Sequence, residues 1–439
     1  MQRMRAGFGV GSMIVICANW AIHDGTFGGR AAIDAGPWLQ AVHRAAHRAG
    51  FGRDGRYRPV DVIDIVFAGD TFDWLTSAVW TRESRPWHAG SAVAHDRARV
   101  RRVSVTRART LLAGLARWVR RGLPVPRADR IGRPRIEDRI RVPVRVAFLS
   151  GDRDASLDEL ATEAARFGCS IGSAWGDEII EVRHGDEWDP LCVRPSPAAR
   201  ARERCPTLRE SIAVDLVARF GGDLLESGHD RGFVGRLVFA IGAVEPILIP
   251  AVLARVMNGH VATGASGRPA PVDHWRRAVD AWHDVAGRNP PSHGLACCPL
   301  DALAATLGAV QSPLAGAPHD APSGLGDLLS GWSAGRSRRV AGGGPPRRVV
   351  VLGHAAAVEV GSGQERIDAV MGLSPPALGR SPGAVATDGT ADGALAARSV
   401  TGRLEPTGRY SWEPLWAECA PVRTPLQGPG RDGWFVDAA

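Results

Sequence analysis

The sequence predicts an α/β protein in which short buried strands end in polar loops. Four apolar runs, 13–18, 62–68, 144–150 and 348–352, lead directly into Gly, Asp, Asn or His residues. Buried parallel strands have this near-continuous apolar composition, and layered α/β proteins place their chemistry in the loops that follow such strands. A fifth run, 179–182, ends just before His184.

Helical patterns fill the connections between these runs. Residues 94–121 place leucines and a tryptophan at helical spacing with arginines opposite, which predicts one crossover helix. The Arg- and Pro-rich stretch 124–143 is expected to be a loop. Further helical patterns cover 208–220, 232–257, 272–286 and 300–307, and Pro, Gly and Ser dominate 313–346, which predicts a flexible linker.

The charge of the chain is a weak guide to its partners. The chain has 439 residues, a net charge of +8 and a pI of about 9.8, and all 54 basic residues are arginines. The total lack of lysine indicates compositional drift across the whole chain. A nucleic-acid site would instead concentrate basic residues on one element among aromatic side chains. Nucleic acid is therefore an unlikely partner on sequence grounds.

The chain shows neither a disulfide framework nor a clear membrane span. Its seven cysteines are widely spaced and contain no Cys-x-x-Cys pair, which favours a reducing, cytoplasmic location. Residues 237–257 are mostly apolar but include Glu245, Arg255 and two prolines. Since a charge within a bilayer is costly, we expect a buried or partner-covering helical hairpin there.

The sharpest motif follows the second apolar run: Gly69-Asp70-Thr71-Phe72-Asp73. It resembles the Gly-Asp-x-x-Asp motif of calcineurin-like metallophosphoesterases, in the version of UDP-diacylglucosamine pyrophosphohydrolase relatives. Four more segments resemble the family's other motifs in the family's order: Asn19-Trp20-Ala21-Ile22-His23-Asp24-Gly25, Gly151-Asp152-Arg153-Asp154, His184-Gly185-Asp186 and Gly353-His354-Ala355-Ala356.

The resemblance implies a four-layer α-β-β-α sandwich with a large, mostly helical insertion. The first part of the core would span 10–190, and 347–439 would complete the core and form a C-terminal tail. Residues 191–312 would form a helical insertion that caps the core or binds a partner, followed by the linker 313–346.

The family holds two metal ions that share one carboxylate and activate a water for attack on phosphorus. By resemblance, the first ion has lost its ligands, because Asn19, Ala21 and Ala356 stand where the family has Asp and His residues. The second position keeps four residues that can coordinate: Asp70, Asp152, His184 and His354.

Two carboxylates and two imidazoles suit zinc, manganese or iron, so the expected cofactor is one divalent metal or none. Asp70 and Asp73 are also compatible with capping a loop. A metal-free hydrogen-bonded pair of His184 and His354 is as good an interpretation as a ligand pair.

Arg153 replaces the histidine that the family would use as a proton donor. An arginine stays charged near neutral pH, so it is expected to bind phosphate or to replace the charge of the lost metal, in place of proton transfer.

These losses favour a pseudoenzyme that keeps a metallophosphoesterase scaffold for a structural or partner-binding role, with a protein partner or oligomer held through 191–312. The alternative is a one-metal phosphoesterase or pyrophosphohydrolase that acts on a nucleotide or lipid-linked phosphate; if active, the chain would be a metal-dependent phosphoric ester hydrolase. A nucleic-acid-binding protein is the third hypothesis and rests on the basic pI alone.

Overall fold

The structure is a computed structural model of the chain. It describes residues 3–5, 11–28, 35–52, 54–81, 84–176, 180–186, 189–192, 206–242, 244, 246, 249–261, 270–288, 300–310, 347–352, 367–372, 399–404 and 410–414.

A six-stranded sheet contains three of the predicted strands at its centre, in the order β13-β12-β2-β3-β6-β7. The strands β2, β3, β6 and β7 run parallel, whereas β12 pairs antiparallel with β2 and with β13. The bounds are β2 Ser12–Cys17, β3 Val62–Ala68, β6 Val144–Leu149, β7 Cys169–Gly172, β12 Ser399–Leu404 and β13 Tyr410–Pro414.

A second sheet has the order β1-β8-β9-β10-β11. The strands β9, β10 and β11 are parallel, and Leu352 of β10 pairs with Arg183 of β9. The bounds are β1 Arg3–Arg5, β8 Ala174–Gly176, β9 Ile180–Arg183, β10 Arg347–Leu352 and β11 Ile367–Gly372.

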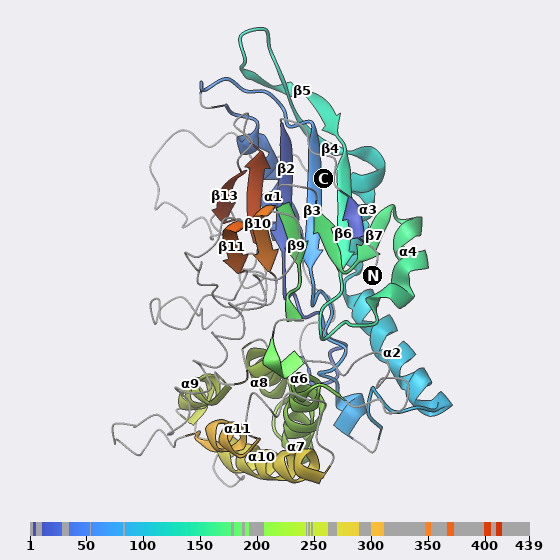
Figure 1. The fold of residues 1–439 in the computed structure, drawn as a ribbon, viewed down its shortest axis with the longest axis vertical. Helices are drawn as coiled ribbons and strands as arrows, with labels where there is room; N and C mark the ends of the chain where they lie inside the picture. Colours follow the sequence, from blue (N-terminus) through green and yellow to red (C-terminus); the bar gives the residue numbers. More distant parts are fainter. Residues whose placement is uncertain are drawn as a thin grey trace.

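The two sheets pack face to face, and helices cover the outer face of the six-stranded one (Figure 1). Alternate residues of β2, such as Ile14 and Ile16, pack with Trp175, Ile180 and Val182 of the second sheet. The intervening residues of β2 face the helices α1 (Gly36–Ala49) and α3 (Arg109–Arg121). The prediction of an α/β class is therefore confirmed, with three layers formed by described residues.

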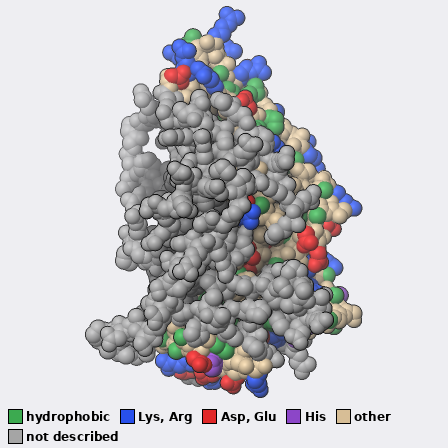
Figure 2. Space-filling view, viewed as in Figure 1, with side chains coloured by type: hydrophobic (Ala, Val, Ile, Leu, Met, Phe, Trp, Pro, Cys, Tyr) green, Lys and Arg blue, Asp and Glu red, His purple; other side chains and the backbone are tan. Residues whose placement is uncertain are grey.

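Two predictions about the segment 94–143 are wrong. The expected single helix is two helices, α2 (Ser91–Arg107) and α3, because the chain turns at Ala108, where ψ is 1°. The expected loop is a hairpin of β4 (Leu123–Ala128) and β5 (Pro134–Val142). Its prolines are tolerated because a two-stranded ribbon consists of edges alone. Figure 2 shows basic side chains gathered at this end of the molecule.

The helices of 208–308 gather at one end of the two sheets and form a core of their own (Figure 1). The first of them is continuous from Leu208 to Glu226, with a π-helical segment in its middle.

Residues 237–257, whose charges argue against a membrane span, contribute to two separate helices. Among the helices of the described residues, none has the length and apolarity needed to cross a bilayer. Their bounds are α6 Leu208–Ser211, η5 Ile212–Ala218, α7 Arg219–Glu226, α8 Arg231–Gly242, α9 Ile249–Val261, α10 Pro271–Arg288 and α11 Leu300–Gly308. The short helices are η1 Ala78–Thr81, η2 Leu157–Leu160, α4 Ala161–Arg166 and η4 Pro190–Cys192.

Candidate metal centre

Backbone strain is concentrated where β2 and β3 end. In the part of the chain that the structure describes, three residues other than glycine have positive φ angles: Asn19 at 53°, Ala21 at 50° and Asp70 at 49°. The two strand ends hold each other in place, because the amide of Asn19 donates to the carbonyl of Gly69 (3.2 Å) and that of Ala21 to Asp70 (2.9 Å). Each such conformation costs about 1–3 kcal/mol and persists where the surroundings fix it, often at a functional site.

Two glycines allow three side chains to converge at these strand ends. A Cβ atom on Gly69 would lie 2.2 Å from Nδ1 of His184. A Cβ atom on Gly151 would lie 2.2 Å from Oδ1 of Asp70 and 2.8 Å from Nε2 of His184. The glycine before each aspartate is therefore required by the close approach of the histidine.

Asp70, Asp152 and His184 form a buried group whose ligand atoms all lie within 4.8 Å of one another. Their exposed fractions are 2%, 1% and 1%. Nε2 of His184 lies 3.1 Å from Oδ1 of Asp152 and 3.5 Å from Oδ2 of Asp70. Three of the four predicted metal ligands are thus brought together. His354 and Ala356 lie outside the described residues, two and four positions beyond the end of β10.

The orientation of His184 requires one of two states at its Nε2 atom. Either this nitrogen is protonated, so that the ring is positively charged, or a cation lies between it and the carboxylates. Nδ1 lies 2.9 Å from the carbonyl oxygen of Ala68, which can only accept, so Nδ1 holds a proton. The lone pair of a neutral ring would then point at two carboxylates. Burial opposes protonation, but Asp70 and Asp152 outweigh it and hold the pKa of His184 well above its usual 6.5.

The same geometry suits a cation. Ligand atoms bound at about 2.0–2.2 Å around one ion lie about 2.8–3.6 Å apart, which matches the separations of 3.1 and 3.5 Å. A metal-binding histidine typically donates its other ring proton to a backbone carbonyl, as His184 does to Ala68. The group could therefore hold a metal ion.

Arg209 enters this group from the helical region. Its Nε lies 3.3 Å from Oδ2 of Asp152 and its Nη1 lies 3.3 Å from Oδ2 of Asp189. A capping box fixes the start of its helix, because the Thr207 hydroxyl accepts from the amide of Glu210 and the Glu210 carboxylate accepts from that of Thr207. The Thr-x-x-Glu signal predicts this helix start, but nothing in the sequence predicts that Arg209 meets Asp152.

Arg153 is buried and its polar atoms are bound by the protein. Nη1 lies 2.7 Å from Oδ2 of Asp73, Nη2 donates to the carbonyl of Gly242 at the end of α8, and the backbone amide donates to Oδ1 of Asp70. Burial lowers the pKa of this guanidinium, but Asp73 and Asp70 outweigh that effect and raise it. The arginine therefore links the strand ends to the helical region.

Two further aspartates stabilise the loops around the group. Oδ1 of Asp73 accepts from the amides of Leu75 and Thr76, so this residue does cap a loop, as its alternative interpretation proposed. Asp154 accepts from the amides of Gly151 and Phe72. Burial and the neighbouring Asp70 raise the pKa of Asp154 to about 7.

Ala21 and His23, which follow the end of β2, offer little to an ion at the group of Asp70. Ala21 ends in a methyl group and borders a cavity of about 10 Å³ against α8, room for about one water molecule. His23 also lines this cavity, but its Nδ1 accepts from the amide of Gly25 and it does not belong to the group of Asp70.

Comparisons of the chain with protein-family models, with curated proteins and with solved structures found no match.

Proposed function

We propose that this chain is a metallophosphoesterase-fold protein with a degenerate dinuclear site, whose role is structural or partner-binding. The observation that carries the proposal is that two protein cations, Arg153 and Arg209, are ion-paired with the carboxylates of the site. A phosphate substrate would need those positive charges free, and here buried aspartates already neutralise them.

One metal position is retained in this proposal. Asp70, Asp152 and His184 would hold a single divalent ion, with His354 as a fourth ligand by resemblance. When bound, such an ion supplies Lewis-acid charge to a phosphoryl oxygen. The chain's own residues orient the ligands: Ala68 fixes the ring of His184, and the amide of Arg153 fixes Asp70.

In this proposal the family's first metal position no longer fits an ion. Asn19 offers a neutral amide and Ala21 a methyl group, and resemblance places Ala356 at the last ligand. Without a pair of metals, the attacking water loses its activation and the transition state loses charge stabilisation, of which a single group supplies about 3 kcal/mol. Arg153 cannot deliver the missing proton, because it stays charged.

The helices of the 191–312 insertion are the proposed partner-binding or assembly region, placed on a core of 10–190 and 347–439 in the family's four-layer arrangement. Support comes from the separate hydrophobic core of α6 to α11 and from its contacts with the site through Arg209 and Gly242. A partner bound to these helices would not need turnover at the site.

The alternative is a one-metal phosphoesterase, which the intact group of Asp70, Asp152 and His184 favours. A phosphodiester and a pyrophosphate turnover assay in Mn²⁺, with the Asp70→Ala variant as control, separates the two. The pseudoenzyme predicts equal background rates for both proteins. Turnover that Asp70→Ala abolishes would overturn it and establish the hydrolase.

A further inference from the structure

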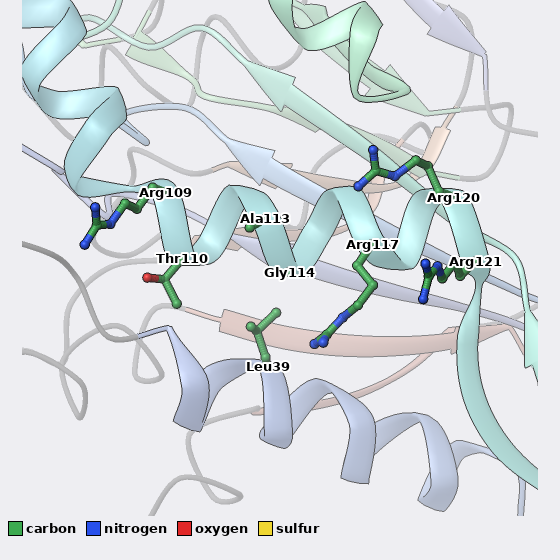
Figure 3. Close-up of a pocket in the computed structure, with 8 residues that line it drawn as sticks. All are labelled: Leu39, Arg109, Thr110, Ala113, Gly114, Arg117, Arg120 and Arg121. Carbon is green, nitrogen blue, oxygen red and sulfur yellow. The ribbon is translucent and has the colours of Figure 1, made fainter. Parts of the chain in front are cut away.

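The outer face of the six-stranded sheet carries a groove lined with arginines, and none of its described lining residues belongs to the carboxylate group. The groove has a volume of about 1160 Å³ and runs along α3 beside α1 (Figure 3). Its described lining residues are Leu39, Arg109, Thr110, Ala113, Gly114, Arg117, Arg120 and Arg121.

Close packing of the two helices at one point creates the groove on either side. A Cβ atom on Gly114 would lie 2.7 Å from Cδ1 of Leu39, so the helices touch there through a glycine. The neighbouring Thr110 and Ala113 are small and exposed. Small side chains thus form the floor of the groove, and the long side chains of the arginines form its walls.

Among the described residues, the arginines of this groove have no acidic partners. Neither α1 nor α3 contains Asp or Glu. Within the described part of the chain, no carboxylate pairs with Arg109, Arg117 or Arg121, which are all exposed. Other exposed arginines do have such a partner, as Arg127 has Asp138.

The arrangement of these arginines suits a chain of phosphates. Arg117 and Arg121 extend from α3 towards α1, and Arg109 lies at the other end of the helix (Figure 3). At 1.5 Å of rise per residue they are spaced about 12 and about 6 Å apart along the axis. Nucleic-acid strands carry one phosphate per about 3.4 Å of axis, so each arginine can contact a different phosphate of one strand.

We propose that the α1–α3 groove binds the phosphate backbone of a nucleic acid without reading its sequence. None of the described lining residues is aromatic, so what these residues offer a nucleic acid is charge and not a surface for base stacking. A membrane surface fits less well, since Leu39 is the one large apolar residue among the described lining residues and is only partly exposed. This site is independent of the proposed pseudoenzyme role.

The test measures the binding of the full chain to short fluorescein-labelled DNA, single-stranded and duplex, by fluorescence anisotropy between about 50 and about 200 mM salt. The groove variant is Arg109→Gln, Arg117→Gln and Arg121→Gln. The control variant removes the same charge from exposed arginines elsewhere: Arg99→Gln, Arg102→Gln and Arg166→Gln.

The groove variant should bind at least about tenfold more weakly at low salt, and its salt slope for single strands should fall by about 2, which is three contacts at about 0.7 each. The control variant should change neither value by a comparable amount. Equal losses in both variants, or wild-type protein that does not bind at low salt, would overturn the proposal.

A second pair of variants tests the groove itself without removing any arginine. Ala113→Glu places a negative charge on the exposed floor, and Ala113→Gln adds the same volume without charge. Ala113→Glu should weaken DNA binding and Ala113→Gln should not, even if the triple variant fails to fold. Equal effects of the two Ala113 variants would contradict the proposal.

Binding to vesicles rich in anionic lipid tests the other class of partner. If wild-type protein binds such vesicles as tightly as DNA, and the groove variant loses this binding, the groove is assigned to a membrane surface and the proposal is overturned.

Discussion

Arginines are used in two opposite ways in the carboxylate site and the α1–α3 groove. In the site, Arg153 and Arg209 are buried and each lies within 3.3 Å of a fixed carboxylate oxygen. In the groove, Arg109, Arg117 and Arg121 are exposed and belong to α3, which has no acidic residue, and neither has the neighbouring α1. The residue type is the same, but burial and the supply of counter-charge both differ.

This difference teaches how to interpret a chain whose basic residues are all arginines. A guanidinium that the fold already neutralises holds elements together, as Arg153 joins the strand ends to Gly242. A guanidinium without a counter-charge leaves its field available to an anion from outside. The following predictions test whether this division between the two regions holds.

The largest effect is expected from Arg153→Met, which removes the cation nearest to two buried aspartates. Asp73 and Asp70 would keep their burial but lose a partner, so the free energy of unfolding should fall by about 3–5 kcal/mol in urea titration. The matched control is Arg58→Met, whose partner Asp54 is exposed, with an expected loss below about 1 kcal/mol. Equal losses in the two variants would mean that burying an arginine–aspartate pair does not increase its contribution to stability.

The next largest effect concerns the close approach of the ligands. Gly151→Ala would place a methyl group 2.2 Å from Oδ1 of Asp70 and 2.7 Å from its amide nitrogen, and the strain should cost about 1–3 kcal/mol of stability. Gly287→Ala, in α10 with open space around its Cβ position, should instead stabilise by about 0.5–1 kcal/mol. Thermal unfolding of both variants measures the contrast. An unchanged melting point for Gly151→Ala would show that the packing around Asp70 can yield.

A smaller effect is expected on metal affinity. Arg209 holds Oδ2 of Asp152 and adds a positive charge beside the candidate ligands, so Arg209→Gln should tighten Mn²⁺ or Zn²⁺ binding by about tenfold. Isothermal titration calorimetry measures the metal affinity of each variant, with the exposed Arg288→Gln as control. Weaker binding in the Arg209 variant would mean that this arginine supports a metal site and does not compete with one.

The smallest expected effect is on the pKa of a histidine, since the two regions shift histidine pKa values in opposite directions. Burial first, then Arg139 and Arg44, lower the pKa of His43 on α1, whereas carboxylates raise that of His184. Since the folded pKa of His43 is below its unfolded value, its contribution to stability is present above about pH 6.5 and is lost as the pH falls. NMR titration should show that Arg139→Gln raises the pKa of His43 and that the distant Arg166→Gln does not. No shift in either variant would contradict a positive field at this face.

The sequence predicts the parts of the structure that local pattern determines. The strands around Ile14, Val66 and Ala147 are visible as apolar runs, and Asp70 and Asp152 follow directly from their ends. Because parallel strands present their carboxyl ends at one edge of a sheet, Asp70 after β3 and Asp152 after β6 meet as expected, and His184 joins them from the end of β9 in the second sheet.

The parts that the sequence does not predict depend on contacts between distant residues. Arg209 lies 57 positions beyond Asp152, and its approach depends on how the whole helical region packs. The break at Ala108 and the pairing of the β4–β5 hairpin also lack a local signal, since Ala favours helices and the Arg- and Pro-rich hairpin has the composition of a loop. The groove arginines are visible in the sequence, but only the packing of Gly114 on Leu39 shows that they line one surface.

The most direct measurement of the central claim is the metal content of the purified full chain together with its phosphodiesterase rate in Mn²⁺. A degenerate site predicts at most one ion per chain, lost in His184→Ala, and a rate equal to that of Asp70→Ala. Two ions per chain, or a rate that Asp70→Ala abolishes, would contradict the claim and show a working dinuclear or one-metal hydrolase.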